Sequence, residues 1–367
     1  MKKAKAKPKK SPTLRKIILE SDLSPGDITM LASAIRDLKK SNPNILVDVK
    51  TSVPQIWENN PYLTDLDPED DDVELIKTEY PLIHSSNSRP YHFIHGYAMF
   101  LEEKLGVKIP VTEFKGDIHL SDTEKSWMSQ VQELGVFQDY WILLAGGKYD
   151  YTAKWWNPIE YQKVVDHFRD KILFVQCGQA DHFHPNLKGV LSLIGKTDPR
   201  QFIRLMYHSV GVLCPVTWAM HLAAAVETYR KRPINRACVV INGGREPVNW
   251  EAYPHHRFLA VNGALDCCEQ GGCWRSRTFK LNDDDEKDNS ICEYPEEIDY
   301  EVKLPPKRES RKLMMPKCMN MIKAEDVIRA IESYYEGGSL KYDGGWEKAK
   351  GSFTKKGKSE TKLPINT

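Results

Sequence analysis

A carboxylate at the start of a helical pattern is the first feature of this sequence that could do chemistry. Asp27 follows an apolar run at 17–19 and the turn Ser24-Pro25-Gly26, and apolar residues at helical spacing continue beyond it. A helix N-terminus stabilises negative charge, and the end of a strand in an α/β sheet is where ligands bind. Asp is also a preferred capping residue, and spacing alone favours that structural role.

A glycine-rich turn followed by lysine is the second feature. Gly146 and Gly147 precede Lys148, and Lys154 lies just before a helical pattern that begins at Pro158. Backbone N–H groups, a helix N-terminus and ammonium groups together suit a diphosphate. The order GxxxxGK[ST] is absent, so the turn is not a P-loop. The alternative is an ordinary turn with a surface lysine.

The third feature is the segment 214–225, in which a strand ends at Cys214 and a helix follows. Thr217 is placed to cap that helix and to offer its hydroxyl and amide to an anion. His221 equally fits a buried, hydrogen-bonded core histidine. Downstream, Arg245 and Glu246 follow Gly243-Gly244 at another strand end, where Arg245 could reach a diphosphate and Glu246 could accept hydrogen bonds from hydroxyls. The alternative is a structural loop with paired charges.

Five of the eight cysteines fall between residues 267 and 318. Four thiolates around one ion form a common structural zinc site. We expect Cys268, Cys273, Cys292 and Cys318 to be the ligands, with Cys267 as a substitute or neighbour. Unpaired buried thiols and a disulfide are the alternatives.

Alternating strands and helices must position these residues. Strands are predicted at 16–20 and 45–49 around a helix from Pro25, forming a parallel βαβ unit. The stretch to about residue 80 reads as an acidic loop, and 91–105 as a helix. The pattern restarts with strands at 141–145, 171–176, 210–214 and 237–241, and helices at 158–168, 199–208, 218–227 and 324–335. Beyond Gly337 we expect a poorly ordered tail.

The order of these motifs resembles glycosyltransferase family 9, the ADP-heptose:lipopolysaccharide heptosyltransferase-like enzymes, over about residues 14–242. The most specific part is Leu193-Ile194-Gly195-Lys196-Thr197 followed by 214–225. The family usually has Asp-Thr-Gly-x-x-His-Leu-Ala-Ala there. Thr217 and His221 match this pattern, whereas Val216 replaces the usual Asp and Trp218 the usual Gly.

The resemblance implies an α/β fold of the GT-B type, two Rossmann-like domains facing a cleft, with a Cys-rich insert near the C-terminus. It implies inverting transfer of a sugar, with heptose and ADP-heptose expected, and Asp27 as the general base. The donor-binding residues implied are Gly146, Gly147, Lys154, Gly178, Gln179, Thr217, Trp218, Met220, His221 and Arg245. Related autotransporter heptosyltransferases look similar in carrying Cys-ligated iron, so iron competes with zinc.

The expected domains are a basic head at 1–13, an acceptor domain at 14–130, a nucleotide-sugar domain at 131–266, a Cys-rich metal module at 267–322, a helix at 323–340 and a flexible tail at 341–367. Lys and Arg number 52 against 51 Asp and Glu, so overall charge does not favour a nucleic-acid partner. No apolar run is long enough to span a membrane, and we expect a cytoplasmic protein.

The expected partners are a nucleotide-sugar donor and a glycan or protein acceptor, and the sequence leaves homo-oligomerisation open. Two other functions stay open. One is an inactive nucleotide-sugar-binding scaffold, suggested by Val216 and Trp218. The other is a transferase acting on protein or nucleic acid.

Overall fold

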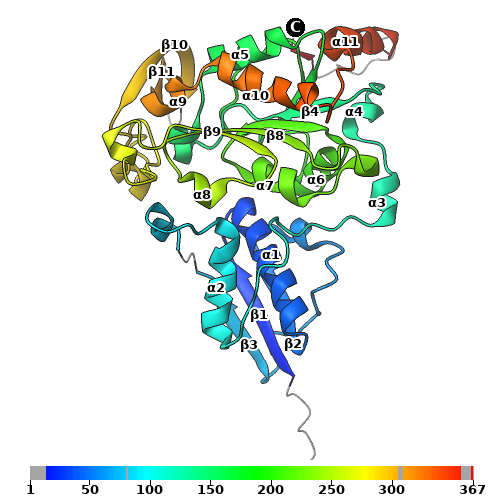
Figure 1. Ribbon diagram of the computed structural model, residues 1–367, viewed down its shortest axis with the longest axis vertical. Helices are drawn as coiled ribbons and strands as arrows, with labels where there is room; N and C mark the ends of the chain where they lie inside the picture. Colours follow the sequence, from blue (N-terminus) through cyan, green and yellow to red (C-terminus); the bar gives the residue numbers. More distant parts are fainter. Residues whose placement is uncertain (1–13, 80–81, 305–308, 357–364, 367) are drawn as a thin grey trace, which may run out of the picture.

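The computed structural model describes residues 14–79, 82–304, 309–356 and 365–366. The basic head therefore lies outside the described residues. Two parallel sheets organise the chain, one small and N-terminal and one large (Figure 1). This is the α/β architecture with parallel sheets that the sequence predicts.

The small sheet has the order β2-β1-β3, and both pairs are parallel. Its strands are β1 (Arg15–Ser21), β2 (Ile45–Thr51) and β3 (Val73–Lys77), and helices α1 (Pro25–Ser41) and α2 (Phe93–Leu105) accompany it. The βαβ unit is confirmed. The prediction of a loop up to residue 80 is wrong in part, because β3 pairs with β1 in this stretch. Only Ile76 of the five β3 residues is buried.

The large sheet has the order β12-β6-β5-β4-β7-β8-β9, and its strands are parallel except for the edge strand β12. Its strands are β4 (Tyr140–Leu143), β5 (Leu173–Gln176), β6 (Val190–Ser192), β7 (Gly211–Pro215), β8 (Ala237–Gly243), β9 (His256–Ala260) and β12 (Ile365–Asn366). Its helices are α5 (Pro158–His167), α6 (Pro199–His208), α7 (Trp218–Ala225), α8 (Val248–Glu251) and α10 (Ala324–Glu336). Short helices α3 (Asp122–Ser126) and α4 (Gln130–Glu133) lie in the connection from the small sheet.

Helices cover both faces of the large sheet. In Figure 1, α5 and α10 lie on the side away from the N-terminal domain, while α6 and α7 face it. Alternate residues of β8 accordingly enter different cores, Val240 toward the N-terminal domain and Val239 toward α10. One hydrophobic cluster includes both α1 and α7, so the domains pack on each other.

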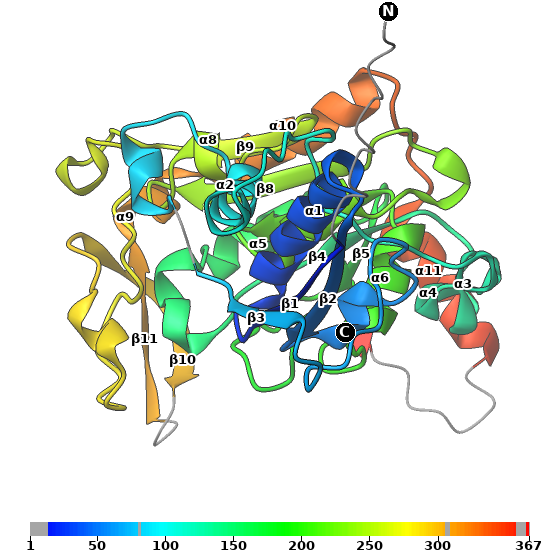
Figure 2. The same ribbon diagram turned by 90° about the horizontal axis from the view of Figure 1, so that it is seen from below.

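The Cys-rich segment contains more regular structure than expected. Its antiparallel hairpin consists of β10 (Pro295–Leu304) and β11 (Glu309–Pro316), followed by α9 (Lys317–Met321). Seen from below, the hairpin lies on the opposite side of the molecule from α3 and α4 (Figure 2). The tail expectation is also wrong for α11 (Gly345–Lys356), because Trp346 and Ala349 are buried against the core.

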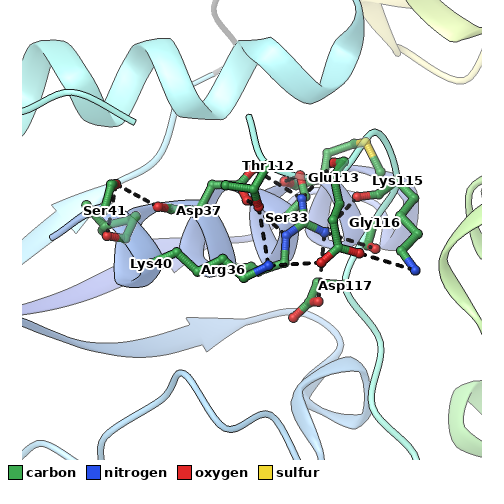
Figure 3. Close-up of polar contacts among 12 residues, drawn as sticks. Ser33, Arg36, Asp37, Lys40, Ser41, Thr112, Glu113, Lys115, Gly116 and Asp117 are labelled. Atoms are coloured by element: carbon green, nitrogen blue, oxygen red, sulfur yellow. Dashed lines mark hydrogen bonds and ion pairs between the residues drawn. The ribbon is translucent and has the colours of Figure 1, made fainter. Parts of the chain in front are cut away.

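A buried arginine fastens the interdomain connection to α1 (Figure 3). The Arg36 guanidinium binds the Asp37 carboxylate and donates to the backbone oxygens of Glu113, Lys115 and Gly116. Gly116 in turn lies between α1 and α7, since a Cβ there would be 2.6 Å from Thr29 Cγ2 and 3.0 Å from Ala225 Cβ. Arg36 therefore holds a segment that passes between the two domains.

A second arginine joins the domains directly. Arg200 of α6 donates to the Gln55 backbone oxygen of the N-terminal domain at 3.3 Å. It also donates to the Glu124 carboxylate at 2.6 and 2.8 Å and to the His119 backbone oxygen at 2.8 Å, both in the connection. No helix among the described residues is long and apolar enough to cross a membrane.

Candidate active site

Asp27 lies at the end of α1 that faces the C-terminal domain. Ser24 occupies the N-cap position, so Asp27 is the third residue of the helix and the capping role favoured by spacing is wrong. Its side chain is buried in the first turn, where the helix N-terminus stabilises a carboxylate. Burial and then the Asp27 charge raise the pKa of Tyr97, which comes from α2.

His221 packs against the residue before Asp27. A Cβ on Gly26 would lie 3.1 Å from His221 Cδ2, so a larger residue there would press on the imidazole. His221 Nδ1 lies 2.7 Å from the Tyr253 hydroxyl, and burial lowers the pKa of His221 to about 3. His221 is therefore the buried, hydrogen-bonded histidine that spacing suggests, and it also lies at the Asp27 end of α1.

The other residues at the start of α7 differ from expectation. Thr217 occupies the N-cap position without a side-chain capping hydrogen bond. The Trp218 indole donates a 2.9 Å hydrogen bond to Thr29 Oγ1 of α1, which uses the side chain between the domains. Met220 is fully buried in the core, a packing position.

Two cations share one buried carboxylate beside this junction. Lys154 Nζ lies 2.8 Å from Glu246 Oε1, and the Arg245 guanidinium donates to the same oxygen. Burial opposes ionisation of Glu246, but Arg245 and Lys154 outweigh it and lower the pKa of the carboxyl. The paired-charge alternative for this loop is thus observed, and the three side chains together keep one positive charge.

Glu251, at the end of α8, is a member of the site that sequence reasoning missed. Its side chain is buried, and Oε2 lies 3.7 Å from His221 Nε2 with no hydrogen-bond partner among the described residues. Burial raises its pKa well above the usual range; Glu246 and Asp27 add to the rise and Lys154 opposes it. A signal was present, because Trp250-Glu251 follows closely on the Gly-Gly-Arg-Glu turn.

The glycine turns at two strand ends bind another part of the chain. Gly147 N donates to Phe183 O at 2.9 Å and Gly147 O accepts from Phe183 N at 3.1 Å, so the expectation of a free amide at Gly147 is wrong. The preceding Gly146 has a positive φ of 87°, and a Cβ at this position would lie 2.1 Å from the Phe183 carbonyl oxygen. Gly178 similarly leaves space for the His184 ring, whose Nε2 is 2.8 Å from Gln179 O.

The five cysteines of the Cys-rich segment meet at one small cavity of about 10 Å³. Burial and the four neighbouring thiols raise the pKa of Cys267 to about 12. All eight cysteines are free thiols, so no disulfide joins them. Within the described ranges, no group of three or more His, Cys, Asp or Glu side chains is arranged to hold a metal ion. The structure therefore gathers the expected ligands Cys268, Cys273, Cys292 and Cys318 without forming a coordination site.

The same cavity borders the loop that carries Arg245 and Glu246. Gly244 and Arg245 line it, and a Cβ on Gly244 would lie 2.8 Å from Cys268 Sγ. Trp274 N donates to Arg245 O at 3.0 Å, and Arg245 Nε donates to Arg275 O at 2.6 Å. The Cys-rich segment thus holds Arg245 directly.

The chain was compared with known protein families, curated proteins and solved structures. The sequence model of Glycosyltransferase family 9 (heptosyltransferase) matches residues 81–230. A comparison with curated proteins gives no significant match.

Solved structures show the same fold at low identity. The Escherichia coli ADP-heptose lps heptosyltransferase II is 14% identical, with a TM-score of 0.52 over 89% of this chain and 100% of that one. The iron-containing dodecameric glycosyltransferase TibC from enterotoxigenic E. coli is 15% identical, with a TM-score of 0.52 over 89% of this chain and 77% of that one. A complex of TibC with ADP-D-beta-D-heptose has a TM-score of 0.53 at 14% identity and the same coverage. The family match and this GT-B-like fold support a glycosyltransferase enzyme.

Proposed function

We propose that the protein transfers a sugar from a nucleoside-diphosphate donor to an acceptor hydroxyl, with inversion at the anomeric carbon and Asp27 as general base. The observation that carries the proposal is the position of Asp27, buried in the first turn of α1 and beside the His221 contact that joins the domains. Because the helix N-terminus favours its charged form, Asp27 is prepared to accept a proton.

In the proposed step, Asp27 takes the proton of the acceptor hydroxyl while that oxygen bonds to the anomeric carbon. The bond from this carbon to the diphosphate oxygen breaks, and the diphosphate leaves with the electron pair. Lys154 and Arg245 would stabilise the leaving group, since both cations lie in the same charged cluster around Glu246. The backbone amides at the start of α7, next to Thr217, would add the positive end of a helix.

ADP-heptose is the donor we propose, because TibC is solved with ADP-D-beta-D-heptose and the E. coli relative is named for ADP-heptose. Gly178 and Gln179 lie after β5, where we expect the nucleotide. Gly146 and Gly147 are retained only as a turn beside it, since Gly147 already bonds to Phe183.

We further propose that four thiolates of the Cys-rich segment hold one structural zinc or iron ion. Cys268, Cys273, Cys292 and Cys318 fit this group because they line one cavity and are free thiols. A bound ion would supply folding energy to the segment and keep these thiols deprotonated. The iron-containing neighbour TibC supports iron as one identity.

The test is turnover of ADP-heptose by Asp27→Asn. The amide keeps the shape of the side chain but cannot accept the acceptor proton, so we expect a loss of about 10²-fold or more in kcat with donor affinity nearly unchanged. Near-normal turnover would remove Asp27 from the base role.

The inactive scaffold is the second candidate. Val216 is buried where the resemblance expects a carboxylate, and Trp218 uses its indole on Thr29. Wild-type protein that binds ADP-heptose but neither transfers nor hydrolyses the sugar would favour the scaffold over the enzyme.

A further inference from the structure

Glu251 is a buried carboxyl that the proposed step does not yet use. Its side chain is only about 5% exposed, and Oε2 has no hydrogen-bond partner among the described residues. Oε2 lies 3.7 Å from His221 Nε2, which is beyond hydrogen-bond distance. Since buried polar atoms are nearly always satisfied, this oxygen indicates a missing proton or ligand.

Charged and titratable groups from several elements face this carboxyl. They are Asp27 of α1, His92 before α2, Lys154 before α5, His221 of α7, Arg245 and Glu246 after β8, and Tyr253 after α8. Burial lowers the pKa values of His92 and His221 to about 3, so both imidazoles are neutral near pH 7.

The remaining charges balance without Glu251. Asp27 and Glu246 supply two negative charges, and Lys154 and Arg245 supply two positive charges. A third carboxylate would make the cluster negative where an anionic diphosphate has to bind. The charge balance therefore favours a neutral Glu251.

We propose that Glu251 is a second catalytic carboxyl, which acts as a carboxylic acid and donates a hydrogen bond from its hydroxyl to a phosphate oxygen of the donor. This inference rests on the proposed function. When the bond to the anomeric carbon breaks, negative charge grows on the leaving diphosphate and the hydrogen bond strengthens. The proton stays on Glu251, so Asp27 remains the only group that takes one up.

Different environments give the two carboxyls these roles. Asp27 lies at a helix N-terminus, which favours its ionised form. Glu251 is buried near two other acids, which raises its pKa. A pair of carboxyls whose environments separate their pKa values is a common arrangement for one base and one acid.

The experiment measures ADP affinity calorimetrically from pH 7 upward, over the range in which the protein stays folded, using full-length wild type, Glu251→Gln and Glu251→Ala. Glutamine keeps a donor at this position but cannot ionise. Because the pKa of Glu251 is raised, its donor is present at low pH and is lost as pH rises through that pKa. We expect wild-type affinity to fall with pH and Glu251→Gln affinity to stay flatter. Alanine should weaken ADP binding by about tenfold or more at pH 7.

Glu103→Gln is the matched control, because Glu103 is exposed on α2, and it should behave as wild type. Circular dichroism checks that each variant is folded; if Glu251→Ala is not, the pH comparison with Glu251→Gln decides. Equal pH dependence in wild type and Glu251→Gln would overturn the role of Glu251 while leaving the proposed function intact. Absence of ADP binding by folded wild type would instead overturn the proposed function and this inference together.

Discussion

Replacing Arg36 with methionine tests whether the buried network on α1 holds the interdomain connection. Arg36 and Asp37 are each about 1% exposed, and their side chains bind each other through two hydrogen bonds of 2.9 and 3.1 Å. Methionine fills part of the volume but removes every donor. Asp37 would keep the 2.5 Å hydrogen bond from Thr112, and the backbone oxygens of Glu113, Lys115 and Gly116 would lose theirs.

The expected cost is large because the change leaves a buried charge without its partner. Removing one member of a buried ion pair costs about 3–5 kcal/mol of unfolding free energy. The double variant Arg36→Met with Asp37→Leu removes both charges, so its loss should be clearly smaller than the sum of the two single losses. Lys40→Met is the control: Lys40 pairs with Glu113 at the surface, and we expect a loss of about 1 kcal/mol or less.

The assay is denaturant unfolding, combined with hydrogen exchange of residues 112–117. We expect faster exchange in this segment for Arg36→Met, since its carbonyl oxygens lose the guanidinium donors that hold them and Gly116 is no longer fixed between α1 and α7. A loss below about 1 kcal/mol, or single losses that simply add, would refute the view that this pair is one tightly coupled unit.

Three further predictions concern the charged cluster and the Cys-rich segment. Lys154→Met should weaken ADP binding and lower kcat because a cation of the cluster is lost, whereas Lys188→Met, at an exposed position, should change neither; equal affinities would make Lys154 a partner of Glu246 alone. Elemental analysis should find about one zinc or iron per chain, and Cys273→Ser with Cys292→Ser should remove it and lower thermal stability, whereas Cys177→Ala should retain it. Because Trp274 and Arg275 of the Cys-rich segment contact Arg245, we expect chelation of the ion to weaken donor binding, measured by calorimetry before and after chelation.

Strong local patterns explain which elements could be predicted. Apolar runs and the turn residues around them are enough for β1, α1 and β2, and Pro199 sets the start of α6. β3 was missed because it is an edge strand next to an acidic stretch and buries one residue. α11 was missed because its lysines and glycines mask the burial of Trp346 and Ala349.

The site was predicted only as far as strand and helix ends allow. The local sequence predicts parallel strands, and the carboxyl ends of parallel strands lie at one edge of a sheet. Four site residues follow such strand ends: Asp27, Lys154, His221 and Arg245. The partner that an ionisable group meets depends on contacts between distant segments. Glu246 pairs with Lys154, which lies 92 residues earlier in the chain (246 minus 154). Glu251 approaches His221 from a separate helix.

The junction between the domains also depends on contacts between distant segments, at positions where the size of the side chain determines whether the domains can pack. Gly26 leaves room for the His221 ring, and Gly116 lets the connection pass between Thr29 and Ala225. Trp218, in place of the small residue that the resemblance expects, directs its indole away from the start of α7 to Thr29. Because each of these contacts spans α1 and the C-terminal domain, they act together on the distance from Asp27 to the Lys154–Arg245 cluster. The proposed transfer requires that distance to be fixed, since the base and the leaving group lie on opposite sides of the anomeric carbon.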